Sequence, residues 1–175
     1  KHLSKAKVCD LINLEPYFSS NPWSLALAGK KVLVIHPFSS IIENQFMNRR
    51  RSIFKDKNVL PEFDLKTLKA PITYPGGDTM SQNWFDNLDD LTNNALKSEF
   101  EIAIIGCGAY GMPLAARLKK AGKKSIHLGG AVQILFGIKG KRWDDMDIFR
   151  EMYNENWIYP SSEKIYKNVE GGCYW

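Results

Sequence analysis

A glycine-rich stretch in the middle of the chain has the composition of a phosphate-binding turn. Residues 106–111, Gly-Cys-Gly-Ala-Tyr-Gly, directly follow the apolar run 102–105, so a buried strand is expected to end in a turn that opens a helix. Glycine allows close approach to a ligand, and the free N–H groups of a helix N-terminus attract anions. The pattern predicts a diphosphate site at Gly106, Gly108, Ala109, Tyr110 and Gly111, although the same glycines also suit a tight turn without a ligand.

Two histidines end predicted strands, His36 after residues 31–36 and His127 in residues 124–128. Because carboxyl ends of parallel strands meet at one edge of a sheet, both rings are expected near the glycine turn. There they could donate to a phosphate or act as acid or base near neutral pH, which makes them the candidate catalytic residues. Alternatively, each ring could hydrogen-bond a neighbouring loop backbone. The predicted flanking walls of the site are Ser39, Gly129, Gly130 and Gln133.

The charged residues near the turn leave several interpretations open. Lys139, Lys141 and Arg142 follow closely enough to reach a phosphate at the same edge, or they form a solvated basic loop. A group of aspartates at 144, 145 and 147 could hold a divalent cation or simply belong to that loop. No metal ligand, catalytic base or nucleophile can be assigned from spacing alone.

Two familiar nucleotide motifs fit the sequence poorly. Dinucleotide-binding turns need an acidic residue about 20 positions later to take the ribose hydroxyls, and His127-Leu128-Gly129 stands at that position. A Walker phosphate loop would need a Gly-Lys-Ser/Thr ending, which the chain lacks. An NAD or FAD cofactor is therefore disfavoured.

The elements that must position these residues alternate along the chain. Residues 31–36 read as a central strand, 63–68 as an outer strand, and 102–105 and 124–128 as two further strands. Helices are expected between them: one with a capping box at Ser40 and Glu43, one from Trp84, and one whose core positions include Met112, Leu114 and Leu118. The order βαβαβαβ predicts a Rossmann-like α/β fold with a mainly parallel sheet flanked by helices.

Composition predicts one domain over residues 1–175, with a core at about 30–138 and an irregular, aromatic-rich loop and tail at 139–175. The net charge of +5 favours anionic partners. No apolar run reaches the ~20 residues of a membrane span and no signal peptide is visible, so a cytoplasmic protein with reduced cysteines is expected. The chain opens on Lys1, as a piece of a longer product would.

Several segments together resemble one group of sugar-transfer proteins from bacterial surface-polysaccharide loci (capsule and O-antigen), related to the GT-D type of glycosyltransferase. Nearly the whole chain takes part. The matching segments are residues 21–23 (NPW), 29–38 (GKKVLVIHPF), 104–111 (IIGCGAYG), 113–115 (PLA), 127–130 (HLGG), 136–143 (FGIKGKRW) and 170–175 (EGGCYW).

The resemblance implies a Rossmann-like enzyme that transfers a sugar from a nucleotide-sugar donor to a glycan or lipid-linked acceptor. Mn²⁺ or Mg²⁺ is expected to bind together with the donor. Peripheral association with a membrane is a further expectation. One feature departs from this group: its acidic D-x-E signature has no equivalent here, since Asp86-Asn87-Leu88 lacks the Glu. These segments belong to the later part of such proteins, so the signature is expected upstream of Lys1.

Two other functions remain open on the sequence. A noncatalytic nucleotide- or NAD-binding module would need no essential acid. A nucleic-acid-binding protein would use the positive charge, but the lysines and arginines are spread over several elements without an aromatic-basic recognition motif, so no nucleic-acid partner is expected. Oligomeric state cannot be read from the sequence.

Overall fold

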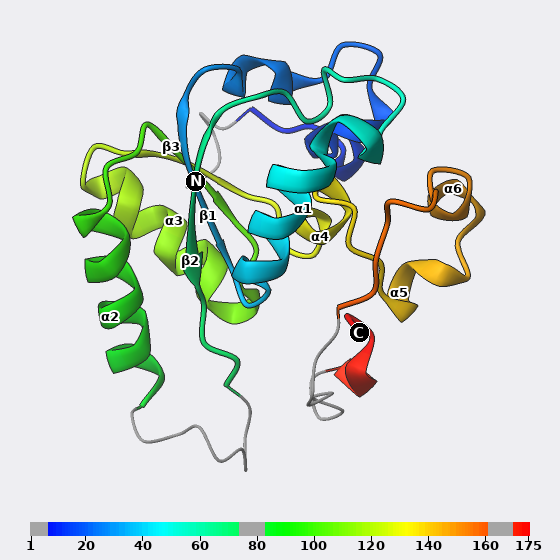
Figure 1. The fold of residues 1–175 in the computed structure, drawn as a ribbon. Coiled ribbons are helices and arrows are strands. Elements are labelled where there is room, and N and C mark those ends of the chain that lie inside the picture. The colour runs from blue at the N-terminus through cyan, green and yellow to red at the C-terminus, as the bar shows by residue number, and fades with distance from the viewer. Residues whose placement is uncertain (1–6, 74–82, 161–169) are drawn as a thin grey trace.

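Four parallel strands form the centre of the computed structural model, which describes residues 7–73, 83–160 and 170–175 (Figure 1). They are β1 (Lys31–His36), β2 (Asp64–Lys69), β3 (Ile102–Ile105) and β4 (Lys124–His127), in the spatial order β2-β1-β3-β4. The register pairs Val32 with Ile102 and His36 with Lys69. The α/β fold with an all-parallel sheet is thus confirmed.

Burial of the strands follows their composition. The apolar run of β1 is buried from its second residue to its last, and β3 is buried over its last three residues. Both therefore lie inside the sheet with layers on both faces. By contrast, β2 mixes exposed and half-buried residues at the sheet edge, as the alternating pattern at 63–68 predicted.

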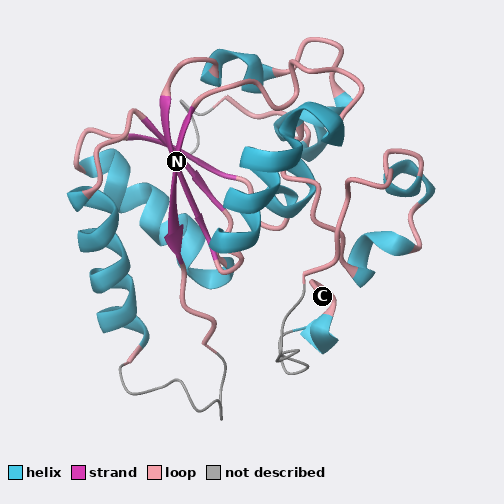
Figure 2. Cartoon of the chain, viewed as in Figure 1, coloured by secondary structure: helices cyan, strands magenta, loops and turns pink. Residues whose placement is uncertain are grey.

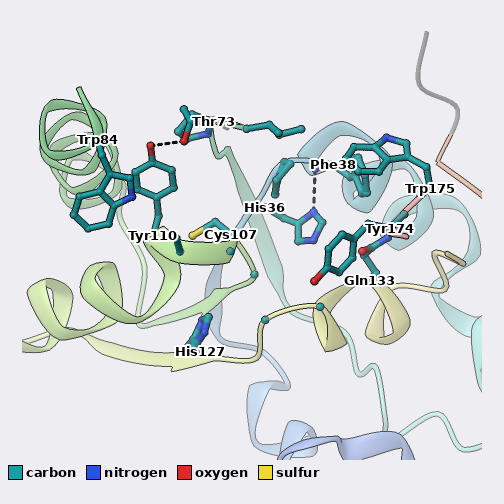
Figure 3. Close-up of a pocket in the computed structure, with 18 residues that line it drawn as sticks. His36, Phe38, Thr73, Trp84, Cys107, Tyr110, His127, Gln133, Tyr174 and Trp175 are labelled. Carbon is teal, nitrogen blue, oxygen red and sulfur yellow. Dashed lines mark hydrogen bonds between the residues drawn. The ribbon is translucent and has the colours of Figure 1, made fainter. Parts of the chain in front are cut away.

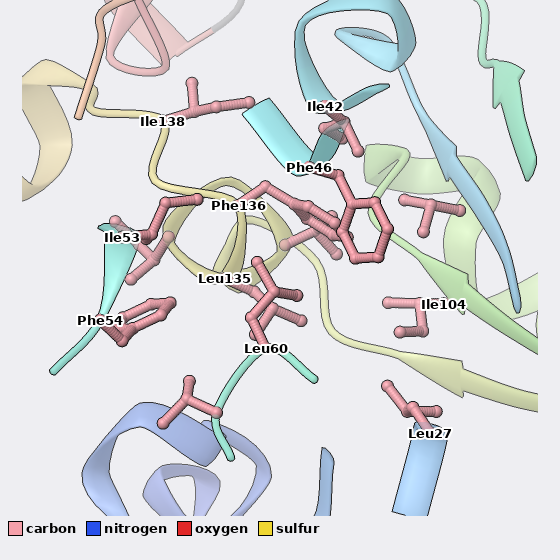
Figure 4. Packing of buried hydrophobic residues seen from close by; sticks show 14 of the residues in the cluster. Leu27, Ile42, Phe46, Ile53, Phe54, Leu60, Ile104, Leu135, Phe136 and Ile138 are labelled. Carbon is pink, nitrogen blue, oxygen red and sulfur yellow. The ribbon is translucent and has the colours of Figure 1, made fainter. Parts of the chain in front are cut away.

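Helices cover both faces of the sheet (Figure 2). On one face, α1 (Ser39–Ile53) and α4 (Ala131–Leu135) pack against the side chains of Val32, Val34 and Ile104, in the core shown in Figure 4. On the other face, α2 (Trp84–Lys97) and α3 (Gly111–Lys120) pack against Leu33 and Ile105. The predicted order βαβαβαβ is present, and the strand order reverses between β1 and β3.

The segment after residue 138 returns to the body of the molecule. Ile138 forms a parallel bridge with Ile158, and Trp157 Nε1 donates a hydrogen bond to the Ile53 carbonyl at the end of α1. Two short helices lie here, α5 (Lys141–Asp144) and α6 (Asp147–Arg150). The described part of this aromatic-rich segment therefore packs against the body of the molecule, although Tyr159 is half exposed.

The remaining described elements are short 3₁₀ helices: η1 (Leu11–Leu14), η2 (Pro16–Phe18), η3 (Trp23–Leu27), η4 (Gly108–Tyr110) and η5 (Glu170–Gly172). Of the described helices, none is long and apolar enough to cross a membrane.

Three local predictions were wrong. The capping box does not form, because α1 begins at Ser39 with Phe38 as its N-cap, two residues before the predicted N-cap Ser40, and Glu43 instead accepts a hydrogen bond from Thr67. Met112 is 72% exposed, because the buried residues of α3 are Gly111, Leu114 and Leu118 and Met112 lies off the face that they form. The basic loop expected at 139–143 is largely the helix α5, whose Trp143 is buried and anchors it. A further predicted capping box and loop at 74–82 lie outside the described residues.

Candidate functional site

A cavity of about 350 Å³ opens at the carboxyl edge of the sheet. Its walls come from the segments that follow each strand: His36 to Phe38 after β1, residues 71–73 after β2, residues 106–110 after β3, and Gly129 and Gly130 after β4. The strand order reverses between β1 and β3, and such switch points are where open α/β sheets hold their ligands. The topology therefore places the cavity where this class of fold binds small molecules.

The glycine turn forms the floor of the cavity. Gly106 donates from its backbone N–H to the carbonyl of Ile35, and a Cβ atom at this position would come within 2.5 Å of the Gly129 carbonyl oxygen. Gly108 has a φ of +54°, which favours glycine, and nothing lies within 4 Å of where its Cβ would be. Gly106 thus allows two loops to pack together, whereas Gly108 leaves open space toward a ligand.

Gly111 has a different reason to be glycine. Its φ is −61°, so backbone strain does not demand it, but a Cβ atom there would lie 2.2 Å from Cε1 of His127. The His127 ring therefore packs directly on the first residue of α3. His127 lines the cavity, and its buried Nδ1 has no hydrogen-bond partner among the residues that the structure describes.

His36 is held in one orientation. The ring is 4% exposed, and Nδ1 accepts a hydrogen bond from the backbone N–H of Phe38 at 3.0 Å. Burial lowers the pKa of His36 to about 3, so the imidazole is neutral at physiological pH. The predicted hydrogen bond to a neighbouring loop backbone is confirmed for this residue, and a protonated His36 is disfavoured as a partner of phosphate.

One wall of the cavity is an aromatic pair from two different elements (Figure 3). Trp84 at the start of α2 stacks on Tyr110, with ring centroids 5.3 Å apart and planes 10° from parallel. The hydroxyl of Tyr110 shares a hydrogen bond of 2.7 Å with Thr73 Oγ1. This wall therefore offers flat aromatic surface of the kind on which planar ligand groups pack.

The opposite wall belongs to the last described segment, residues 170–175. Trp175 meets Phe38 edge to face at 5.4 Å, and Gln133 Nε2 donates to the Tyr174 carbonyl at 3.0 Å. Arg142 donates from its backbone N–H to the Cys173 carbonyl and from its guanidinium to the Tyr174 hydroxyl. Residues distant in sequence are thus fixed beside the segment that follows β1.

Comparisons with known proteins return one likeness and two negative results. No protein-family model matches the chain, and no curated protein matches it. A solved structure described as domain of unknown function 1792 (DUF1792), in selenomethionine-substituted form, is similar at a TM-score of 0.47 and 18% sequence identity. The match covers 87% of this chain and 54% of that chain, so the chain spans about half the length of the structure it matches.

Most residues predicted for the site lie together in the structure. The predicted residues that line the cavity are His36, Gly106, Gly108, Ala109, Tyr110, His127, Gly129, Gly130 and Gln133. Five others do not line it. Gly111 lies behind His127, Ser39 is buried in the first turn of α1, Lys139 lies over the rings of Tyr153 and Tyr159, and Lys141 and Arg142 belong to α5. Arg142 reaches the site indirectly, through Tyr174.

Several lining residues were not predicted. Pro37, Phe38, Pro71, Ile72 and Thr73 follow the ends of β1 and β2, so applying the strand-end rule to every strand would have found them. Cys107 lies within the glycine turn, and burial raises the pKa of its thiol to about 12, which keeps it neutral. Trp84, Tyr174 and Trp175 reach the cavity from distant elements, and nothing in their local sequence indicates it.

Proposed function

We propose that the cavity binds the diphosphate and nucleoside of a nucleotide-sugar, and that the chain is a glycosyltransferase, or the nucleotide-binding part of one, in glycan synthesis. The observation that supports this most directly is the position of the glycine turn. It lies at the switch point of a parallel sheet, forms the floor of a cavity and leads into α3. The glycosyl-transfer step rests on the sequence resemblance described above.

In this proposal the donor diphosphate lies against the backbone of Gly106, Gly108, Ala109 and Tyr110. Departure of the nucleotide places negative charge on the diphosphate, and N–H groups fixed near a helix N-terminus stabilise such charge without reorganising. Among the described lining residues, none carries a charged Lys or Arg side chain. The N–H groups of Gly106 and Tyr110 already donate to the carbonyls of Ile35 and Cys107, so the diphosphate would accept hydrogen bonds from the N–H groups of Gly108 and Ala109. Arg142 reaches the cavity lining through its hydrogen bond to the Tyr174 hydroxyl.

A divalent cation finds no matching ligands in the described part of the cavity. Mg²⁺ and Mn²⁺ prefer carboxylate and other oxygen ligands. None of the described lining residues is Asp or Glu, and the described chain holds no group of three His, Cys, Asp or Glu side chains suited to a metal. The residues present do not fit a metal here, so no step is assigned to one.

A noncatalytic nucleotide-binding module is the second candidate. The chemistry of the described lining favours it, because the polar side chains there are histidines, hydroxyls, a thiol, an amide and indoles, with no carboxylate to serve as a base. The two candidates share the same ligand site and differ in whether a sugar is transferred.

Calorimetric titration with UDP, GDP, UDP-glucose and NAD, with and without Mn²⁺, tests the shared claim. Binding of UDP or GDP at least ten times tighter than NAD supports it, and NAD preference or no nucleotide binding contradicts it. Phosphorus NMR of the UDP-glucose mixture then separates the candidates. Release of UDP supports transferase chemistry, whereas binding without turnover supports the module.

A further inference from the structure

Two almost completely buried polar side chains line the same cavity, each anchored at one end. His36 is 4% and Gln133 1% exposed. His36 Nδ1 accepts from the Phe38 backbone, and Gln133 Nε2 donates to the Tyr174 carbonyl, both at 3.0 Å. No described group bonds to the other polar atom of either side chain, Nε2 of His36 or Oε1 of Gln133.

These anchoring bonds fix the hydrogen-bonding character of the remaining atoms. A backbone N–H can only donate, so Nδ1 of His36 carries no proton and the neutral ring must carry it on Nε2. A backbone carbonyl can only accept, so the amide nitrogen of Gln133 faces Tyr174 and leaves Oε1 as an acceptor. The cavity wall therefore presents one fixed donor and one fixed acceptor.

A phosphate cannot satisfy both groups. Ionised phosphate oxygens accept hydrogen bonds but do not donate, so they would leave Gln133 Oε1 unpaired in a buried position, which is unfavourable. A hydroxyl group or the imide edge of a base both donates and accepts. The ring of Phe38, against which Trp175 packs, adds apolar surface beside the pair (Figure 3).

We propose that His36 Nε2–H and Gln133 Oε1 form a neutral donor–acceptor pair that recognises the uncharged nucleoside part of the ligand, while the phosphates lie on the glycine turn. The assignment of the ligand as a nucleotide rests on the proposed function; the donor and acceptor assignments do not. In this arrangement His36 is a binding residue that keeps its proton, rather than an acid or base.

The pair is expected to act independently of pH over the neutral range. Burial holds the pKa of His36 far below neutrality, and an amide does not titrate. The other titratable side chains among the described lining residues are Cys107, Tyr110, His127 and Tyr174, and burial keeps the Cys107 thiol neutral. A pH dependence of nucleoside binding near neutrality would therefore have to come from a group other than His36 and Gln133.

Two substitutions at His36 separate the anchor from the donor. An Asn side chain at position 36 places its amide oxygen near the former position of Nδ1, so it keeps the acceptor for the Phe38 N–H but lacks the Nε2 donor. A Gln side chain can place an N–H donor near the former position of Nε2. We expect His36→Asn and Gln133→Met each to weaken binding of uridine or guanosine about tenfold. We expect His36→Gln to retain binding within about threefold of the wild type, and all three variants to bind pyrophosphate as the wild type does.

The outcomes distinguish this proposal from the proposed function. Nucleosides that bind through His36, with no binding of pyrophosphate, would support the pair and contradict the diphosphate site. Pyrophosphate binding without nucleoside binding would overturn the pair and leave the diphosphate site intact. Equal loss of pyrophosphate and nucleoside affinity in His36→Asn, with a native circular dichroism spectrum, would also overturn it.

Two further measurements sharpen the test. The ¹⁵N chemical shifts of His36 at neutral pH should show an unprotonated Nδ1 and a protonated Nε2, and the opposite tautomer would overturn the proposal without any ligand. Loss of affinity for 3-methyluridine, whose imide donor is blocked, would place the base edge on the pair. An affinity for 3-methyluridine equal to that for uridine would place a ribose hydroxyl on the pair instead. In both cases the group that contacts His36 and Gln133 is uncharged.

Discussion

The ring of His127 lies directly on Gly111, so that a Cβ atom at Gly111 would come within 2.4 Å of Nδ1 and 2.2 Å of Cε1. This contact joins the end of β4 to the first turn of α3. The last glycine of the turn is therefore required by side-chain packing at one edge of the sheet.

Replacing Gly111 with alanine should reduce the free energy of unfolding by about 1–3 kcal/mol, because the added methyl group overlaps the His127 ring. Urea denaturation followed by circular dichroism measures the change. Met112→Ala in the same helical turn is the matched control, since Met112 is exposed, and it should stay within about 0.5 kcal/mol of the wild type.

A double-mutant cycle tests whether the overlap with His127 is the cause. Gly111→Ala combined with His127→Ala should recover much of the stability lost in Gly111→Ala, because the second substitution empties the space that the methyl group needs. Simple additivity of the two losses would show that Gly111 is required for another reason.

Gly106 and Gly108 should respond differently to alanine. At Gly106 the new Cβ would meet the Gly129 carbonyl oxygen at 2.5 Å and Val132 Cγ2 at 2.8 Å, and backbone cannot move aside cheaply. We expect Gly106→Ala to cost about 3 kcal/mol. Gly108→Ala meets open space and should cost about 1 kcal/mol through its positive φ alone. Equal costs in thermal or urea unfolding would contradict this account of the turn.

The buried His36 should make the protein less stable in mild acid. Its folded pKa is about 3, whereas an unfolded imidazole titrates near ~6.5, so between these values the unfolded state binds more protons. The stabilisation is complete above the unfolded pKa and is lost as pH falls toward the folded pKa. The slope from this residue approaches about 1.4 kcal/mol per pH unit.

His36→Asn removes this titration while keeping an acceptor for the Phe38 N–H. Unfolding free energies measured between about pH 5 and 6.5, above the range of most carboxylates, should fall less steeply in the variant than in the wild type. Identical slopes would show that folding does not lower the pKa of His36.

Trp175 should matter for stability as well as for the cavity wall. Its ring is buried and packs edge to face on Phe38, so Trp175→Ala should cost about 3 kcal/mol. Trp175→Phe keeps an aromatic ring on Phe38 and should cost less than half as much. Fluorescence-detected thermal unfolding compares the two, and wild-type stability of Trp175→Ala would show that this wall is not needed for the fold.

The sheet could be predicted from sequence because each strand carries its own signal. The apolar run at β1 predicts a strand buried on both faces, and the alternation at β2 predicts a strand buried on one face. The structure has both strands in the predicted places. Helix starts were harder: the Ser40 and Glu43 pair matches a capping box, yet packing of Phe38 and Ile42 begins α1 earlier. Tertiary packing overrode a local signal there.

The site could be predicted only in part, for a related reason. Residues at strand ends converge by topology, so His36, the glycine turn and Gly129 were found from sequence. Tyr174 and Trp175 reach the cavity because Gln133 and Arg142 hold the segment that contains them, a long-range arrangement without local periodicity. Lys139 was expected near the phosphates on spacing, but its ammonium group lies over the Tyr153 and Tyr159 rings.

A charge placed in the glycine turn tests the central claim most directly. Gly108 has open space beside it and a φ that Asn and Asp tolerate better than other side chains, so Gly108→Asn and Gly108→Asp should fold alike and differ only in charge. Calorimetric titration with UDP should show that Gly108→Asp binds at least ten times more weakly than Gly108→Asn. Equal UDP affinity of the two variants would contradict a diphosphate site at this turn.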